Sequence, residues 1–86
     1  MPRWLTLQRS IVPAGDRKRF MERLRARRAY YAEAKCGFWI FEESGLPGAL
    51  IEFVEAPDRE TLESALAGAP DHIVDTGRIY REVESS

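Results

Sequence analysis

Two neighbouring segments of this chain are apolar on both sides of the strand that each of them predicts. Residues 38–41 read Phe-Trp-Ile-Phe, and residues 49–55 read Ala-Leu-Ile-Glu-Phe-Val-Glu. Successive side chains of a strand point to opposite faces of its sheet, so each segment places large apolar side chains on both faces. An antiparallel sheet with water on one side alternates apolar with polar residues instead. We therefore expect a sheet that must be covered on both faces.

The remaining segments place these strands in a β-α-β-β-α-β order. Residues 43–48 contain Gly and Pro and predict the turn of a hairpin between the two apolar segments. The other expected elements are a strand over residues 3–12, a helix from an N-cap at Asp16 to about Ala34 that Gly37 terminates, a helix with Asp58 as N-cap that Gly68 closes, and a last strand over residues 77–84. This order predicts an α+β, ferredoxin-like domain over residues 1–86, with a four-stranded antiparallel sheet and both helices on one face.

The face of the sheet that the helices leave open predicts a homodimer. A chain of 86 residues buries a small core, and its single Cys and single His exclude an internal disulfide or a His/Cys zinc site as reinforcement. The simplest cover for the second face is the sheet of another copy of the same chain. We expect two protomers to associate through this face.

The strand and helix segments resemble those of a known superfamily. The run from Cys36 to Phe41, the hairpin, and residues 51–62, which read Ile-Glu-Phe-Val-Glu-Ala-Pro-Asp-Arg-Glu-Thr-Leu, are similar to the dimeric α/β-barrel superfamily and, within it, to antibiotic-biosynthesis-monooxygenase-like domains. The resemblance implies two sheets packed face to face across a dimer, with small ligands held between each sheet and its helices. It implies no single reaction, because the group includes cofactor-independent oxygenases, haem-degrading enzymes, isomerases and proteins without known activity.

Composition removes the haem-degrading branch of this group. Those members use an Asn, a Trp and a helical His, whereas this chain has no Asn and its only His, His72, lies beyond the second expected helix. The sequence also contains no paired metal-ligand spacing and no dinucleotide or P-loop glycine pattern. We expect neither a cofactor nor a metal.

His72 and Tyr31 are the candidates for catalysis. His72 is the only side chain whose ordinary pKa lies near neutrality, and Asp71 and Asp75 could orient it as a general acid or base. The alternative is a solvent-exposed loop histidine. In oxygenase chemistry without metal or flavin, the substrate would supply the reducing carbanion, and the protein would supply a base and hydrogen-bond donors such as the Tyr31 hydroxyl.

The candidates for ligand binding are Tyr30, Trp39, Arg27 and Arg28. The aromatic residues could form the wall of a pocket between helix and sheet, although core packing explains them equally well. On a helical wheel, Arg27 and Arg28 flank the apolar stripe of the first helix. Either could hold a carboxylate or phosphate, or could instead pair with acids of the second half of the chain, such as Glu60 or Glu63.

Charge is divided unevenly along the chain. Residues 1–41 hold ten cations and three anions, and residues 42–86 hold three cations and eleven anions. Within one compact domain these halves cancel much of each other's long-range field, so the basic half does not by itself indicate nucleic-acid binding. RNA-recognition domains share the strand order, but the third strand here carries Glu52 and Glu55 and lacks their basic-Gly-aromatic signature.

No stretch approaches the ~20 apolar residues of a membrane span, and the N-terminus lacks the apolar core of a signal peptide. We therefore expect a cytoplasmic homodimer without nucleic-acid or membrane partners. Two functions remain open. The first is a protein that binds a small aromatic or anionic organic molecule between helices and sheet, with or without monooxygenase-like turnover. The second is a non-catalytic dimerisation or interaction module without a small-molecule site. An enclosed cavity beneath the first helix would favour the former, and solid packing the latter.

Overall fold

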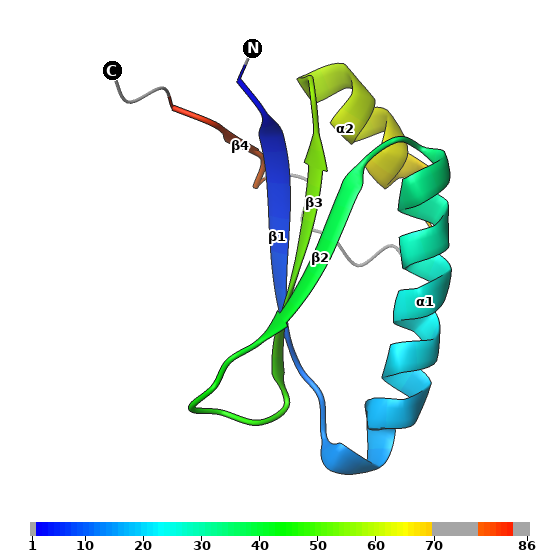
Figure 1. Cartoon of the computed structure of the whole chain (residues 1–86), viewed down its shortest axis with the longest axis vertical. Coiled ribbons are helices and arrows are strands. Elements are labelled where there is room, and N and C mark those ends of the chain that lie inside the picture. Colours follow the sequence, from blue (N-terminus) through cyan, green and yellow to red (C-terminus); the bar gives the residue numbers. More distant parts are fainter. Residues whose placement is uncertain (1, 70–77, 84–86) are drawn as a thin grey trace.

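The protein forms one four-stranded antiparallel sheet with two helices on one of its faces (Figure 1). The computed structural model describes residues 2–69 and 78–83. In chain order the elements are β1 (Trp4–Ile11), the 3-10 turn η1 (Ala14–Asp16), α1 (Arg17–Glu33), β2 (Gly37–Glu42), β3 (Ala49–Ala56), α2 (Arg59–Ala67) and β4 (Tyr80–Arg81). The expected α+β class and element order are confirmed, and the arrangement is compatible with a ferredoxin-like fold.

The register of the sheet determines which side chains share a face. The strands lie in the order β2-β3-β1-β4. Along β1 and β3 the pairing runs without a bulge from Trp4 opposite Ala56 to Ile11 opposite Ala49, and β2 pairs with β3 from Gly37 opposite Glu55 to Glu42 opposite Leu50. Because directly paired residues point to the same side, each face can be assigned residue by residue across three strands.

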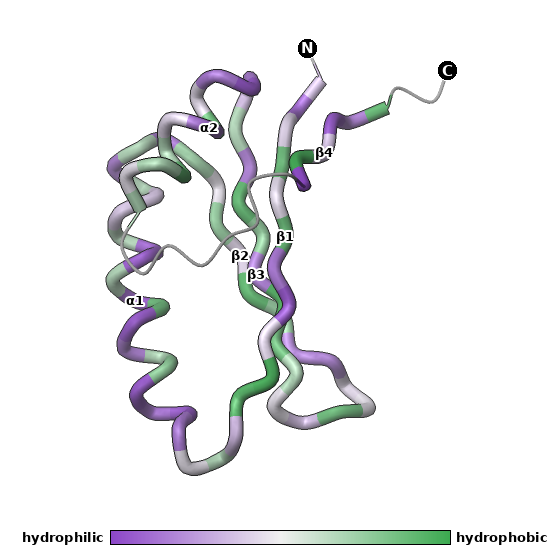
Figure 2. The backbone as a smooth tube through the Cα atoms, turned by 180° about the vertical axis from the view of Figure 1, so that it is seen from behind, coloured by the Kyte–Doolittle hydropathy of each residue, from purple (hydrophilic) through white to green (hydrophobic). Residues whose placement is uncertain are grey.

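The apolar core occupies one end of the space between helices and sheet. It joins α2, the last turns of α1, and the ends of β3 and β1; its buried members are Tyr31, Cys36, Val54, Ala56, Leu62, Ala65 and Leu66, with Trp4 and Phe38 packed against them. The first half of α1 is mostly hydrophilic in Figure 2, and Leu24 is its buried apolar residue. The helix–sheet layer is therefore apolar at one end and polar at the other.

The two helices begin differently, which confirms one expected cap and corrects the other. Asp58 caps α2, because its carboxylate accepts a hydrogen bond of 2.7 Å from the Thr61 backbone N–H. Asp16 forms no such bond. The Asp16 N–H donates to the Pro13 carbonyl at 2.9 Å, which closes η1 and gives Asp16 a helical backbone (φ −101°, ψ −3°). Asp16 is the residue that precedes α1, as expected, but a capping side chain needs an extended backbone, so the expected side-chain cap does not form.

The end of α1 also differs from the expected glycine stop. Lys35, with φ 61°, takes the left-handed conformation that turns the chain out of the helix, and the Cys36 N–H donates to the Tyr31 carbonyl at 2.9 Å. Gly37 is already the first residue of β2. A side chain there would lie 2.6 Å from Cη2 of Trp39, so Gly37 provides the space in which the indole lies along its own strand.

The last strand is shorter than the predicted span. Within residues 78–83, β4 comprises Tyr80–Arg81 and pairs with Trp4 and Leu5 at the start of β1, whereas residues 77 and 84 of the predicted strand lie outside the described residues. Neither helix in the described part of the chain combines the length and the apolar character that crossing a bilayer requires.

Candidate functional site

The sheet face opposite the helices carries an apolar patch, which we call the open face. Its apolar residues come from all four strands and are Leu5, Leu7, Ile11, Trp39, Phe41, Ile51, Phe53 and Tyr80. Several of these large side chains are exposed, including Trp39 at 45% and Phe41 at 57%. This confirms that strands β2 and β3 are apolar on both sides and that, among the described residues, the helices cover one side only.

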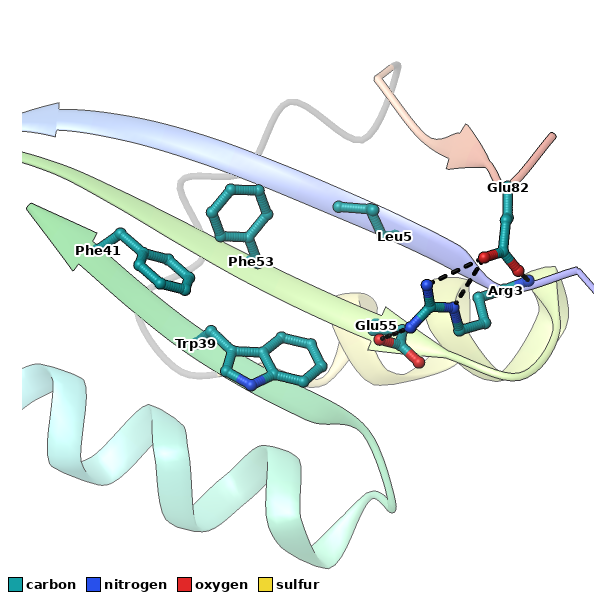
Figure 3. A pocket seen from close by; sticks show the side chains of 7 residues that line it. All are labelled: Arg3, Leu5, Trp39, Phe41, Phe53, Glu55 and Glu82. Carbon is teal, nitrogen blue, oxygen red and sulfur yellow. Dashed lines mark hydrogen bonds and ion pairs between the residues drawn. The ribbon is translucent and has the colours of Figure 1, made fainter. Parts of the chain in front are cut away.

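A hollow of about 360 Å³ lies on the open face, over its middle rows and up to the edge at Arg3 (Figure 3). Its floor is formed by Leu5, Trp39, Phe41 and Phe53, which come from three adjacent strands. The Phe41 and Phe53 rings meet edge to face, with centroids 5.6 Å apart. The floor of the hollow therefore offers a wide aromatic surface.

Arg3 forms the charged end of this hollow. Its guanidinium donates to the Glu82 carboxylate at 2.9 and 3.2 Å and to Glu55 at 3.4 Å (Figure 3). The hydrogen bonds from Arg3 hold the pKa of Glu82 below its ordinary value. One cation between two carboxylates leaves this group with a net negative charge, so the hollow suits apolar or aromatic groups better than anions.

A second hollow, of about 250 Å³, lies between the start of α1 and the end of β1. We call it the α1–β1 groove. Its lining residues are Ser10, Ile11, Val12, Pro13, Asp16, Arg19, Phe20 and Arg23. This groove belongs to the layer between helix and sheet, where the sequence predicts a small-molecule site. It combines an apolar wall with two guanidinium groups and one carboxylate.

The helix–sheet layer continues from this groove into a buried polar seam. Arg27 lies one helical turn beyond Arg23 and forms an ion pair of 2.7 Å with Glu52 on β3; their side chains are 7% and 6% exposed. The guanidinium of Arg27 also lies 5.8 Å from the centre of the Phe20 ring. Burial raises the pKa of Glu52, and the charge of Arg27 opposes that rise.

The seam holds three buried polar atoms without a hydrogen-bond partner among the described residues. They are Nε of Arg27, Oε1 of Glu52 and Oε1 of Gln8. Gln8 is the direct cross-strand partner of Glu52, so their side chains share the helix-facing side of the sheet. The short Arg27–Glu52 contact is thus an ion pair whose hydrogen bonding is incomplete. The buried seam can still donate or accept hydrogen bonds at these atoms.

The tyrosines of α1 occupy the apolar end of the layer. Tyr31 is 2% exposed and stacks on Phe38 with ring centroids 5.4 Å apart. Burial is the main reason that the pKa of its hydroxyl rises to about 12. The Tyr30 hydroxyl donates to the Ala65 carbonyl of α2 at 2.6 Å. Both rings pack between elements.

The sequence-based site residues are dispersed in the structure. Trp39 lies on the open face, whereas Tyr31, Tyr30 and Arg27 lie on the helix side of the sheet. Arg28 is exposed on α1. His72 lies outside the described residues. The structure therefore does not bring Trp39 together with Tyr31 in one pocket.

Sequence reasoning missed two contributors, Glu52 and Arg3. Glu52 alternates with Leu50 and Val54 along one strand, and this spacing places its carboxylate on the core-facing side. Arg27 pairs with this residue and not with Glu60 or Glu63. Arg3 had no comparable signal, because its partner Glu82 is 79 residues away in the chain.

Among residues 2–69 and 78–83, no group of three or more His, Cys, Asp or Glu side chains is arranged to hold a metal ion. Burial raises the pKa of the Cys36 thiol, so less of it is present as the reactive thiolate.

No family model, curated protein or solved structure matches this chain. Its function must be inferred from the open face, the α1–β1 groove and the buried seam.

Proposed function

We propose that this chain functions as a homodimer in which two open faces pack against each other, forming the dimeric α/β barrel expected from the sequence, and that each protomer binds a small organic molecule between α1 and its sheet. The observation that carries the proposal is the open face. Apolar patches rimmed by polar residues mark interaction sites on soluble proteins, and the open face has this composition.

The composition of the open face supports a protein partner. Protein interfaces combine an apolar, aromatic-rich centre with a polar rim, and Trp, Tyr and Arg dominate their binding energy. Trp39, Phe41 and Phe53 form the centre of this face. Arg3 with its two carboxylates borders one end, and Arg9, which pairs with Glu43 at 3.7 Å, borders the other.

Its charges support a second copy of the same chain. A two-fold interface brings identical surfaces together, so each surface must complement itself. Each end of the open face holds a cation beside a carboxylate. Whichever ends of the two copies meet, an arginine of one copy can therefore lie opposite a carboxylate of the other. The whole chain has a net charge of only −1, so two copies do not strongly repel each other.

The size of the face sets the expected strength of association. The seven residues 5–11 of β1 make the face roughly 23 Å long at ~3.3 Å per residue. Three adjacent strands make it roughly 14 Å wide at ~4.8 Å per strand. This footprint is smaller than the ~800 Å² that each partner contributes to a standard interface. We therefore expect a reversible dimer that dissociates on dilution.

Sedimentation velocity from about 1 to 500 µM protein tests this proposal, because the monomer–dimer balance follows concentration. The wild type should shift from monomer to dimer across this range, and the Trp39→Ser/Phe41→Ser variant should remain monomeric. Leu46→Ser is the matched control, because Leu46 is 44% exposed but lies in the hairpin turn. Circular dichroism verifies the fold of each variant. A wild type that stays monomeric throughout would sink the dimer proposal.

The α1–β1 groove supports the small-molecule part of the proposal. It lies in the layer in which the resemblance implies a ligand, and it joins apolar and charged groups as ligand sites do. Monooxygenase-like turnover stays a prediction of the resemblance. With its pKa raised to about 12, the Tyr31 hydroxyl stays protonated at neutral pH as a donor must, but Tyr31 packs in the core and does not line the groove. The non-catalytic module is the function that remains if the groove binds nothing.

A further inference from the structure

We propose that the α1–β1 groove binds a small organic monoanion, a carboxylate with a short apolar body, with Arg19 and Arg23 as its anion-binding residues. This inference rests on the small-molecule part of the proposed function and supplies its ligand class. It is independent of the dimer, because the groove and the centre of the open face lie on opposite sides of the sheet.

The first argument is the pairing of the cations on α1. Arg17 is paired with Glu42 at 2.8 Å and Arg27 with Glu52 at 2.7 Å. Arg19 and Arg23 line the groove, and neither forms an ion pair with any residue in the described part of the chain. Four residues apart on one helix, they lie on the same flank and can address one ligand together. Guanidinium groups match the planar, two-oxygen geometry of a carboxylate.

The charge balance of the groove favours a single negative charge. Arg19 and Arg23 contribute two positive charges, and Asp16 contributes one negative charge. The sum is +1, which a monoanionic carboxylate neutralises. A phosphate dianion would leave an excess negative charge beside Asp16.

The remaining lining selects an organic ligand over an inorganic anion. Val12, Pro13 and Phe20 form an apolar wall, Ile11 borders it from the open face, and Ser10 contributes a hydroxyl. A volume of about 250 Å³ is smaller than the ~300–1,000 Å³ typical of drug-sized ligand sites. A compact acid with one ring or a short chain therefore fits better than an extended molecule.

The buried seam provides a second observation beside the groove, because the Arg27 guanidinium lies 5.8 Å from the centre of the Phe20 ring and Phe20 lines the groove. Arg27, one turn beyond Arg23, is 6% exposed, and its Nε has no hydrogen-bond partner among the described residues. Gln8, which precedes Ser10 by two residues and faces the same side of β1, leaves Oε1 unpartnered as well. Buried polar atoms usually have partners. The polar side of the layer therefore continues past Arg23, with unused donor and acceptor atoms on Arg27 and Gln8.

The test is a ¹⁵N NMR titration of the protein with sodium benzoate, and benzyl alcohol serves as the uncharged match. Benzoate should shift the backbone signals of Ser10, Phe20 and their neighbours in a saturable way, and benzyl alcohol should bind at least about tenfold more weakly. Arg19→Gln/Arg23→Gln should weaken benzoate binding by roughly tenfold, as expected for the loss of two charge-assisted contacts.

The matched control is Lys18→Gln/Arg25→Gln, which removes the same charge from exposed positions of the same helix that do not line the groove. This variant should bind benzoate within about twofold of the wild type. Equal weakening in both double variants would show a general electrostatic effect and overturn the inference. Inorganic phosphate that binds as tightly as benzoate, or shifts that are absent from the groove, would overturn it too.

Sedimentation of the same samples separates this inference from the proposed dimer. All four substituted positions lie on α1, away from the open face, so both double variants should dimerise like the wild type. Loss of benzoate binding with an intact dimer concerns the groove alone. A monomeric wild type that still binds benzoate would contradict the dimer and leave the groove assignment in place.

Discussion

Glu52 is the residue whose ionisation most directly opposes the fold. Its carboxylate is buried on β3, and burial raises its pKa above the ordinary value of 4.5 despite the nearby Arg27. The folded state therefore holds the Glu52 proton to a higher pH than the unfolded state does. Where the folded state binds more protons, the free energy of unfolding decreases as pH rises.

We predict a pH-dependent stability difference between the wild type and Glu52→Gln. The stabilising contribution of protonated Glu52 should be complete below about pH 4 and should be lost as pH rises through the raised pKa, with a constant difference above it. Urea unfolding at a series of pH values measures this difference. The exposed carboxylates Glu42, Glu82 and Asp58 have lowered pKa values and act in the opposite direction. They act equally in both proteins and cancel, so a difference that does not vary with pH would contradict the prediction.

Part of the candidate site could be predicted at this scale, and part could not. The helical periodicity of α1 correctly brought Arg27 beside the apolar stripe, because that requires only the helix geometry. Its partner depends on how β3 packs against α1, and Glu52 was not recognised because a carboxylate on a strand is usually exposed. Tyr31 and Trp39 were expected in one pocket, but they lie on opposite faces of the sheet, a distinction that local spacing does not contain.

Among the connections, the hairpin between β2 and β3 depends on one glycine. Gly48 has φ 93°, and a Cβ there would lie 2.8 Å from the Val12 carbonyl oxygen. Its N–H donates to Glu42 at 3.0 Å, and its carbonyl accepts from the Val12 N–H at 2.8 Å. Glu42 in turn binds Arg17, so this glycine joins the hairpin to the start of α1.

We predict that Gly48→Ala destabilises the protein by about 1–3 kcal/mol. The new methyl group would lie too close to the Val12 carbonyl oxygen, and alanine disfavours the positive φ of this position. Gly45→Ala in the same turn is the control: nothing lies within 4 Å of its Cβ position, and its effect should stay within about 0.5 kcal/mol. Chemical unfolding of both variants provides the measurement. Equal effects of the two substitutions would show that the Gly48 contact is not limiting.

The elements themselves were more predictable than their ends. The two helices and the first three strands follow from apolar periodicity and from Gly and Pro positions, which are local properties of the chain. Asp16 and Asp58 have the same side chain in similar sequence positions, yet only Asp58 caps a helix. The difference is the turn that precedes α1, and this turn depends on the path from β1, which pattern alone does not specify.

At the scale of the whole molecule, the proposed dimer should couple folding to protein concentration. Association that involves only the folded state stabilises it by mass action. We predict that the thermal unfolding midpoint of the wild type rises by several degrees between about 1 and 500 µM, because ~1 kcal/mol shifts the midpoint of a domain of this size by about 4–8 °C. Differential scanning calorimetry measures this rise. Trp39→Ser/Phe41→Ser should show a midpoint independent of concentration, and a rise in that variant would place the interface elsewhere.

The fold could be predicted to the level of its layers, and the uncovered face was part of that prediction. The doubly apolar strands indicated a second covering layer, and the open face has the expected residues. The basic first half and the acidic second half of the chain are also joined by an ion pair, because Arg27 of α1 pairs with Glu52 of β3. The α1–β1 groove could not be predicted, because its lining comes from the meeting of a strand end, a short turn and a helix start.

The placement of the two tryptophans gives the protein two built-in optical reporters. Trp4 packs against the core on the helix side, with the Arg59 guanidinium 5.7 Å from its ring, and Trp39 lies exposed on the opposite face above Gly37. Emission from Trp4 therefore senses whether the helices are docked, whereas emission from Trp39 senses whether water still reaches the far side of the sheet. In the Trp4→Phe variant, Trp39 is the single tryptophan. Burial of the open face would then shift the fluorescence emission of this variant to shorter wavelength, without any attached dye.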